Sequence, residues 1–131
     1  MNGPLPKKVF KTTEFKKWQA SLKDDVTGAV IDARIKKLQF GLRGDTKSVG
    51  QGVCELRIAL GPGWRVYYHE TDVGAVVLLL LGGNKSTQKS DIKEAKNILN
   101  DLKTKQAAAK AKAKAETKAR VPSKGESDEQ K

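Results

Sequence analysis

The sequence predicts an α+β fold, in which a small, twisted, mainly antiparallel sheet carries an N-terminal αα-hairpin and is followed by a C-terminal helix. Three observations predict it. Apolar side chains recur at helical spacing between residues 15 and 42. They alternate with other side chains between 53 and 69, as in strands with one buried face. An uninterrupted apolar run, 75–81, then ends at two glycines, which is typical of a strand covered on both faces.

The first forty residues predict an edge strand followed by two helices. Residues 1–6 contain two prolines and are expected to be flexible, and residues 8–11 can form a short edge strand. Helical spacing then predicts helices over 13–22 and 26–40, the first capped by a threonine and the second by an aspartate. Gly41 suits the end of the second helix, because glycine adopts a left-handed conformation without strain.

The middle of the chain predicts three consecutive strands. The first two cover about 53–60 and 64–69, and Gly61-Pro62-Gly63 between them cannot continue a strand. The third, 75–81, is far too short to cross a membrane as a helix and is expected at the centre of the sheet. The polar connector before the first strand has room for one further short strand near Lys47.

Alternation along the first two strands divides their side chains between two faces. If the apolar side chains face the core, the opposite face carries a polar and basic set. This set is too polar and too basic to be buried, so we expect it to form an exposed working surface. Its members are Glu55, Arg57, Arg65, Tyr67 and His69.

Beyond the third strand the sequence predicts an exit loop and a closing helix. Lys85 follows the strand directly, where a rigid element positions a loop, and is a candidate by that position. Either Ser86 or Asp91 can cap the closing helix, and Asp91 with Glu94 has the spacing of a capping box.

The composition changes near residue 106. Up to Arg120 the segment 106–131 is rich in alanine and lysine and has no apolar side chain large enough to form a core, so it predicts a helical extension that becomes disordered after about Val121. The expected organisation is therefore a flexible 1–6, a folded domain over 7–105 and the tail 106–131. The tail lysines suit either a solvated segment or an arm that binds nucleic acid.

Charge and composition narrow the functional classes. The formal net charge is +11, and residues 1–105 alone hold 19 basic and 11 acidic side chains. A positive field of this size favours phosphate-rich or acidic partners, although it also suits a solvated surface. One cysteine, Cys54, allows no internal disulfide, and the N-terminus lacks a signal-peptide core, which together indicate the cytoplasm. One cysteine and one histidine make a zinc site unexpected, and no cofactor is predicted.

Several segments together resemble the RelE/ParE superfamily of bacterial toxins, and most closely its HigB-like branch of addiction-module killer proteins. The likeness covers roughly residues 8–103. It lies in the segments FKKWQASL (15–22), ARI (33–35), GQGVCELRI (50–58), GPGWRVYY (61–68) and LLGGNKSTQ (80–88), and in Asp91, Ile92 and Ala95.

The resemblance implies a toxin that is neutralised by a cognate antitoxin. Many members are ribosome-dependent mRNA endonucleases, whereas ParE-type members poison DNA gyrase. In the nucleases, the arginine of a Gly-aromatic-Arg motif contacts the scissile phosphate, and Arg65 matches it in Gly63-Trp64-Arg65. Lys85 matches the basic residue after the last strand, and Arg57 best matches an upstream basic residue.

The resemblance also implies the partners. These are an antitoxin of the helix-turn-helix class, mRNA on the ribosome, and operator DNA bound through the antitoxin complex, with no membrane partner. One departure concerns the closing helix, where RelE has a catalytic tyrosine and this chain reads Ser90-Asp91. HigB-like nucleases often have a histidine there, but His69 lies on a strand. The general acid and base therefore stay unassigned.

Metal-free RNA cleavage requires removal of a proton from a 2′-hydroxyl, cations on the phosphorane and a proton for the leaving oxygen. Forked donors such as Arg57 and Arg65 suit the phosphate, and Lys85 can add charge or exchange a proton. Glu55 can act as a base or can hold Arg57 in an ion pair.

The candidate catalytic residues are Arg65, Lys85 and Arg57. The candidate RNA-binding residues are Tyr67, Glu55, Lys89 and Lys47. A gyrase-directed toxin and a non-catalytic nucleic-acid-binding module remain alternatives.

Overall fold

The computed structural model of the 131-residue chain describes residues 6–71 and 76–120, with side chains up to residue 109. Its contacts divide the chain into two units, 1–99 and 100–131, which are described separately. The flexibility expected of residues 1–6 and the disorder expected after Val121 lie almost wholly outside the described residues. No helix in the described part of the chain has the length and apolar character needed to span a membrane.

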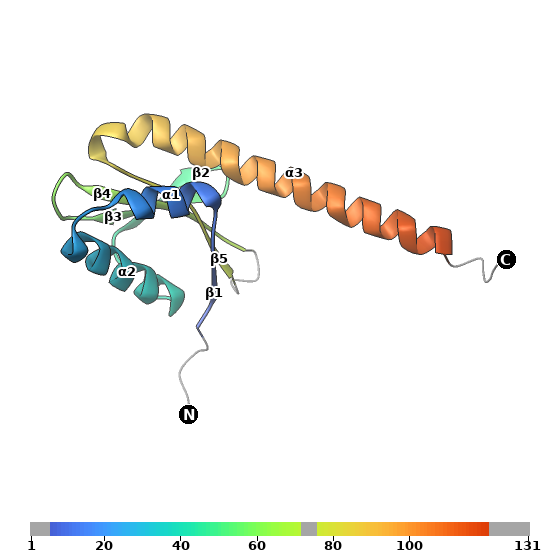
Figure 1. The fold of residues 1–131 in the computed structure, drawn as a ribbon, viewed down its shortest axis with the longest axis horizontal. Helices are drawn as coiled ribbons and strands as arrows, with labels where there is room; N and C mark the ends of the chain where they lie inside the picture. Colours follow the sequence, from blue (N-terminus) through green and yellow to red (C-terminus); the bar gives the residue numbers. More distant parts are fainter. Residues whose placement is uncertain (1–5, 72–75, 121–131) are drawn as a thin grey trace, which may run out of the picture. The chain divides into compact units, whose positions relative to one another are not determined.

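The first unit is built on a five-stranded sheet with the order β1-β5-β4-β3-β2 (Figure 1). β1 pairs in parallel with β5, and the other three pairings are antiparallel. The expected α+β class and antiparallel-rich sheet are therefore confirmed, including the edge strand and the short strand near Lys47. The strands are β1 (Lys8–Lys11), β2 (Thr46–Gly50), β3 (Val53–Ile58), β4 (Trp64–Glu70) and β5 (Val76–Asn84).

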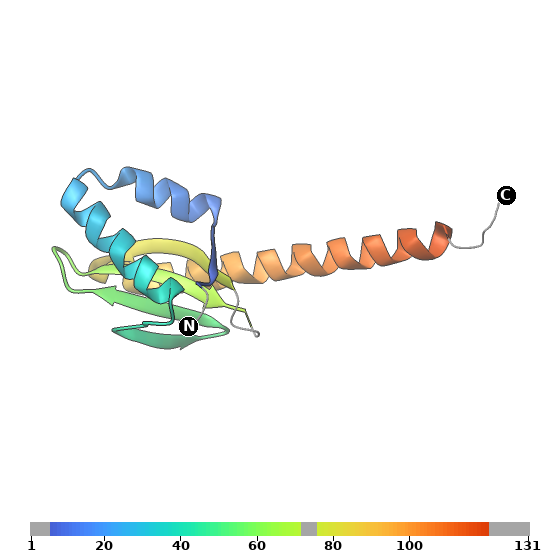
Figure 2. The ribbon, with the colours of Figure 1, turned by 90° about the horizontal axis from the view of Figure 1, so that it is seen from below.

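The αα-hairpin consists of α1 (Thr13–Ser21) and α2 (Asp25–Gln39), which lie on the same side of the sheet (Figure 2). The Thr12 hydroxyl accepts a hydrogen bond from a backbone N–H of α1, and the Asp24 carboxylate does the same for α2. Both caps satisfy free N–H groups at a helix start. Gly41 follows α2 with φ +84°, as its predicted role at the helix end requires.

The main core lies between the hairpin and one face of the sheet. It holds apolar side chains of α1 and α2 together with the inward-facing side chains of β3, β4 and β5. Its buried members are Phe15, Ile31, Ile35, Leu38, Leu56, Ile58, Val66, Tyr68, Val77 and Leu79.

β5 differs from its prediction in extent and position. The apolar run was expected to end at Leu81, but the strand continues through both glycines to Asn84, while Ala75 lies outside the described residues. Buried side chains on both faces confirm that helices cover the strand from two sides. The central strand of the five is β4, however, because the parallel strand β1 adds beyond β5 and β2 adds beyond β3.

The closing helix α3 (Gln88–Arg120) follows a single 3-10 turn, Lys85–Thr87. The predicted cap at Ser86 or Asp91 was wrong. Asn84 caps the 3-10 turn and forms a capping box with Thr87, because the last strand residue already has an extended conformation and an acceptor side chain. Asp91 lies inside the first turn of α3 instead.

The first turns of α3, up to Leu99, lie on the side of the sheet opposite α2 (Figure 1). Three apolar side chains of this segment, Ala95, Ile98 and Leu99, are buried. The expectation that the polar sheet face is an exposed surface was therefore wrong, since Glu55 and Tyr67 have no exposed area. The apolar side chains of α3 are buried by packing against the sheet, and the polar face is the one that the helical hairpin does not cover.

The second unit, residues 100–131, is helical as far as Arg120 within the described residues. Apart from Leu102, the side chains of residues 100–109 are exposed. The helical character expected of the alanine- and lysine-rich segment is confirmed to Arg120, and the predicted boundary at residue 106 stays a prediction.

Candidate nucleic-acid interface

The strand register brings the two candidate arginines together. Arg57 on β3 pairs directly with Arg65 on β4, and one step along the strands Glu55 pairs with Tyr67. Directly paired residues in an antiparallel sheet point to the same face. The predicted common facing of the two arginines is thus confirmed, on the face that the start of α3 partly covers.

Glu55 is the centre of a hydrogen-bond network. Its carboxylate accepts hydrogen bonds from Arg57 Nε at 2.9 Å, Gln88 Nε2 at 2.7 Å and the Tyr67 hydroxyl at 3.2 Å. A buried carboxylate requires such donors, because leaving it unpaired away from water is very unfavourable. Of the two roles considered for Glu55, the ion pair with Arg57 is the one that the structure contains.

This network also fixes protonation states. Burial by itself would raise the pKa of Glu55, but the hydrogen bonds from Arg57, Gln88 and Tyr67 outweigh it and hold the pKa below its usual value. Burial, together with the neighbouring Glu55 charge, raises the pKa of Tyr67 well above that of free tyrosine. At neutral pH the site therefore holds one fixed carboxylate and one neutral phenol.

Arg65 is held much less firmly than Arg57. Its side chain is 12% exposed, and its Nε lies 3.9 Å from Glu55 Oε2, with no hydrogen-bond partner among the described residues. Its Nη1 donates only long hydrogen bonds, 3.4 and 3.5 Å, to the carbonyls of Gly63 and Trp64. The guanidinium therefore has hydrogen-bonding capacity to spare at the edge of the network.

Two glycines shape the surroundings of Arg65. Gly83, which pairs with Arg65, packs against Asp91 of α3, because an added Cβ would lie 1.9 Å from Asp91 Oδ2 and would force that carboxylate to move. An added Cβ at Gly63 would lie 3.3 Å from the Cβ of Lys85. Lys85 is therefore next to the turn between β3 and β4 that precedes Arg65. The end of β5 and this β3–β4 turn lie close together.

The remaining candidates divide into near and distant groups. Lys85 and Lys89 are exposed at the exit of β5 and the first turn of α3. Lys47 is exposed on the edge strand β2, where it pairs with Glu55 and shares its face. His69 is not part of the site, because it lies towards the other end of β4 and its Nδ1 is 2.8 Å from the Gly52 carbonyl oxygen.

Two of the expected RNA ligands have a different position from the one predicted. Tyr67 and Glu55 were expected to face solvent, but both side chains are fully buried and bonded to each other. Neither presents a surface on which a base could stack. Their contacts instead orient Arg57 and, through Glu55, limit where Arg65 can lie.

Three residues of the site were missed as members of it. Gln88 donates to Glu55, Asp91 approaches the backbone of Gly83, and Asn84 caps the turn that holds Lys85. The sequence indicated Gln88 only as part of the family-like segment 80–88. One signal could have identified Gln88. It is a polar residue at the start of the closing helix, and that helix covers a sheet face that contains a carboxylate.

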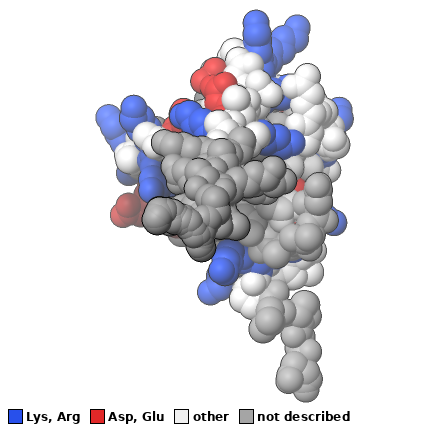
Figure 3. Space-filling view, turned by 90° about the vertical axis from the view of Figure 1, so that its right-hand side faces the viewer, with Lys and Arg blue, Asp and Glu red and all other residues white. Residues whose placement is uncertain are grey.

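Basic side chains are not confined to this site. On the described part of the face drawn in Figure 3, lysines and arginines lie at several separated places, with few acidic side chains. Among the described residues, no group of three or more histidine, cysteine, aspartate or glutamate side chains is arranged to hold a metal ion. Position within the fold, rather than charge density, distinguishes the site.

Comparison with known proteins gives relatives at the level of sequence and of fold. The chain is 50% identical over 91 residues to an uncharacterized protein of Haemophilus influenzae, and the match spans 70% of this chain and 91% of that protein. No family model matches the sequence.

Two solved structures resemble the fold. The toxin–antitoxin complex RelBE2 of Mycobacterium tuberculosis has a chain that aligns with a TM-score of 0.50 and 20% identity, over 62% of this chain and all of that one. A doubly substituted form of the E. coli toxin RelE in the free state aligns with a TM-score of 0.54 and 14% identity, over 68% and 97%.

Together, the sheet, the hairpin on one face and the basic strand end define a protein with the RelE-like fold, as the sequence predicted. Within that class, the chain belongs to the same family as the Haemophilus influenzae protein.

Proposed function

We propose that this protein is the toxin of a type II toxin–antitoxin system and that it inhibits translation by cutting mRNA on the ribosome. Two kinds of observation support the proposal. The fold is shared with RelE and with a chain of the RelBE2 complex, which are described as a toxin and as part of a toxin–antitoxin complex. The site has the cations that phosphodiester cleavage requires.

The observation that carries the proposal is the state of Arg65. A guanidinium that lies beside a buried carboxylate, yet makes only long hydrogen bonds, can turn towards a phosphate without breaking a strong contact. Free enzymes often have catalytic hydrogen bonds that are long and shorten only when the substrate is bound. Arg65 is therefore the residue proposed to hold the scissile phosphate.

The other cations have supporting roles in this proposal. Arg57, 35% exposed and fixed through Nε by Glu55, keeps its terminal nitrogens for a second phosphate oxygen. Lys85 adds positive charge from the adjacent exit loop, and Lys89 and Lys47 would contact the RNA backbone further away. The cleavage itself uses the 2′-hydroxyl of the RNA as nucleophile and requires no metal.

Glu55 and Tyr67 are positioning residues in this scheme and not RNA ligands. Glu55 is ionised and accepts three hydrogen bonds, so its lone pairs are already directed at protein donors. Tyr67 keeps its proton at neutral pH because burial raises its pKa. General acid and base are assigned to no side chain of the site.

The proposal includes a HigB-like branch assignment, a cytoplasmic location and a cognate antitoxin with a helix-turn-helix domain. The antitoxin could cover Arg57, Arg65 and Lys85 with carboxylates, or it could bind the outer surface of the helical hairpin and block entry to the ribosome. Operator DNA would be bound by the antitoxin complex and not by the toxin alone.

The function is tested with purified protein in a translating extract that contains a defined mRNA, with DNA gyrase supercoiling measured in parallel. The proposal predicts cleavage of the mRNA only while it is being translated, and unchanged supercoiling. Inhibition of gyrase without cleavage would identify a ParE-type toxin instead. RNA binding without either effect would identify a non-catalytic nucleic-acid-binding module.

The antitoxin is tested by coexpression with the neighbouring open reading frame. We expect the two proteins to copurify and the growth arrest caused by this protein alone to be relieved. A neighbour that neither binds nor protects would contradict the toxin–antitoxin assignment, whatever the result in the extract.

A further inference from the structure

A pocket of about 280 Å³ opens on the hairpin side of the sheet, at the end where β4 begins and β5 ends. It is formed by the last turn of α1, the link to α2 and the two strand ends. This volume is at the small end of the range for ligand pockets, so it suits a single small group. Of the residues that line it, only Asn84 also belongs to the site described above.

Two aromatic side chains line the pocket together with aliphatic and polar ones. Trp18 and Trp64 line it with their rings edge to face and their centroids 6.1 Å apart. Trp18 is fixed by close packing on the backbone of β5, since an added Cβ at Gly82 would lie 2.1 Å from its ring. Both rings are half-buried, so each keeps some surface for a ligand. Preformed aromatic surfaces of this kind bind unstacked nucleic-acid bases.

Polar groups of both types border these rings. The Asn84 amide oxygen accepts hydrogen bonds from Ser86 N at 2.9 Å, Ser86 Oγ at 2.6 Å and Thr87 N at 3.3 Å. These bonds orient the amide, and its NH₂ group makes no hydrogen bond to the described residues. The Asp24 carboxylate, which caps α2 by accepting hydrogen bonds from Val26 N and Thr27 Oγ1, also lines the pocket and is an acceptor there.

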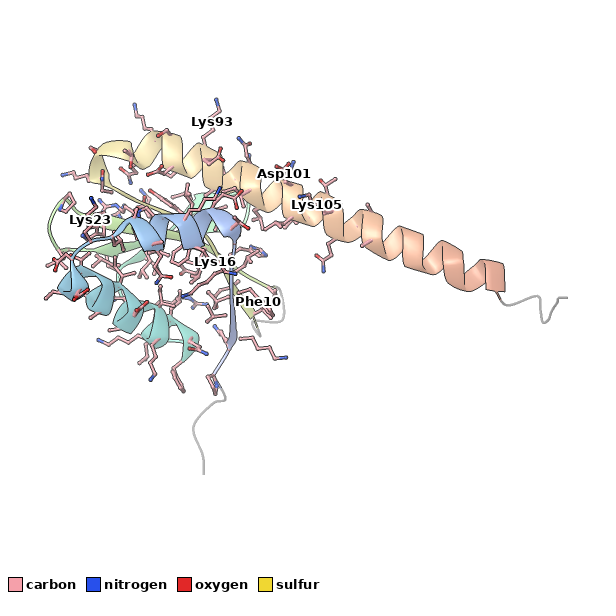
Figure 4. The ribbon with its side chains drawn as sticks, viewed as in Figure 1. Phe10, Lys16, Lys23, Lys93, Asp101 and Lys105 are labelled. Atoms are coloured by element: carbon pink, nitrogen blue, oxygen red, sulfur yellow. The ribbon has the colours of Figure 1, made fainter. Side chains whose placement is uncertain are left out.

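A cation lies at the rim. Lys23 lines the pocket from the link between the two hairpin helices (Figure 4). A donor, an acceptor and a cation around a pocket lined by two aromatic rings match a heterocycle that has hydrogen-bonding edges and a nearby phosphate.

The pocket and the proposed phosphate site occupy the same strand ends. Trp64 precedes Arg65 on β4, and Asn84 precedes Lys85 at the end of β5. Successive residues of a strand point to opposite faces, so Trp64 and Arg65 lie on opposite faces at this end of β4. Lys85 follows Asn84 in the 3-10 turn and lies beside the turn that precedes Arg65, since an added Cβ at Gly63 would be 3.3 Å from its Cβ. An RNA strand that passes around this end of the sheet would reach both the pocket and the two cations.

We infer that the pocket lined by Trp18 and Trp64 binds one unstacked nucleobase of a single-stranded RNA whose phosphate is held at Arg65 and Lys85. The inference deepens the proposed function, because it adds the base-recognition part of the same substrate site. Base stacking supplies affinity, and Asn84 and Asp24 supply hydrogen bonds that discriminate among bases.

The test uses the fluorescence of the protein itself, since Trp18 and Trp64 are the two tryptophans of the chain and both line the pocket. Short single-stranded oligoribonucleotides should quench this emission saturably. The same oligomers with abasic nucleotides should bind about tenfold more weakly and should not quench, given that stacking on an aromatic side chain is worth about 1–3 kcal/mol per base. Nucleoside monophosphates should bind far more weakly than the oligomers.

A blocking variant separates the pocket from general RNA binding. Ser21→Phe adds a ring at the exposed rim of the pocket, whereas Ala20→Phe adds the same ring on the neighbouring exposed position of α1 that does not line it. We expect Ser21→Phe to weaken the quenching interaction about tenfold. Ala20→Phe should bind as the natural sequence does, and both variants should unfold at a similar temperature.

Three results would overturn the inference. They are equal quenching by abasic and base-bearing oligomers, equal affinity of the two phenylalanine variants, and mononucleotide binding as tight as oligomer binding, which would indicate a site for free nucleotides. With any of these results, the proposed function would still be supported if the protein of natural sequence cleaved mRNA. Base-dependent quenching in a protein that does not cleave mRNA would contradict the proposed function and not the pocket.

Discussion

At the scale of single residues, the arrangement of the site depends on Glu55. A carboxylate with no exposed area is stable here because three side chains donate hydrogen bonds to it. Two of these donors come from other elements, Tyr67 from β4 and Gln88 from α3. The Glu55–Arg57 pair was predicted as one of two alternatives, since residues two apart on a strand share a face. Its burial was not predicted, because nothing in the strands themselves indicates which helix covers them.

Glu55→Gln tests this network through the pH dependence of stability. Because the folded protein holds the pKa of Glu55 below that of the unfolded chain, its contribution is present above the unfolded pKa and is lost as pH falls through the folded pKa. Glu55→Gln should therefore lose about 1–3 kcal/mol of unfolding free energy at neutral pH and less at acidic pH. Denaturant unfolding measured at both pH values checks this.

The matched control is Glu94→Gln, which removes the same charge from an exposed position of α3. It should leave both values nearly unchanged. Glu70, whose pKa is also lowered by hydrogen bonds from Lys7 and Arg43 against the effect of burial, keeps some acid sensitivity in every variant. If the free energy of unfolding fell by the same amount from neutral to acidic pH in Glu55→Gln and in the natural sequence, the role given to Glu55 would be contradicted.

At the scale of elements, the end of β5 is the point where both helical layers reach the sheet. Gly82 lies beneath the ring of Trp18 from α1, and Gly83 lies beneath Asp91 from α3. The sequence predicted the hairpin layer but not the α3 layer on the polar face, and it placed the two glycines at a strand end. It did not predict that the strand continues through them, because glycine weakens a strand unless close packing from the faces requires it.

Gly82→Ala should therefore be destabilising. The added methyl group has to displace the Trp18 ring, and overpacking of this kind typically costs about 1–3 kcal/mol. The contrasting variant is Gly28→Ala in α2, where an added Cβ meets nothing within 4 Å and φ is not left-handed. It should stabilise the protein by about 0.5–1 kcal/mol, because alanine favours a helix.

Thermal or denaturant unfolding of both glycine variants measures the two effects. Equal stability of Gly82→Ala and the natural sequence would show that Trp18 can leave the strand without loss, and would contradict the packing described for β5.

At the scale of the whole molecule, periodicity was enough to predict the elements but not their complete arrangement. Alternation, an uninterrupted apolar run and helical spacing predicted β3, β4, β5 and the three α-helices of the described residues, with most boundaries within a residue or two, and the two edge strands were predicted only as short possible strands. The parallel pairing of β1 with β5 joins residues nearly seventy positions apart, and no local pattern specifies it. The contact of α3 with the polar sheet face is also a contact between distant parts of the sequence that no local pattern specifies. For this reason the prediction that this face is exposed was wrong.

The tail provides a prediction at this scale. Residues 107–120 contain no apolar side chain larger than alanine, so their removal takes nothing from a hydrophobic core. A chain ending at Gln106 should unfold at nearly the same temperature as the full chain, as measured by calorimetry. A fall of several degrees would show that the tail contributes to the stability of the folded domain.

The most direct test of the central claim compares mRNA cleavage by Arg65→Ala and Arg43→Ala in a translating extract, with cleavage sites mapped by primer extension. Both variants remove one arginine, but Arg43 is paired with Glu70 and lies outside the site. Arg65→Ala should stay folded, because Glu55 keeps three hydrogen-bond donors without it. The account predicts that Arg65→Ala loses cleavage by at least about a hundredfold, the loss typical when one transition-state donor is removed, while Arg43→Ala cuts normally. Full cleavage by a folded Arg65→Ala would contradict it.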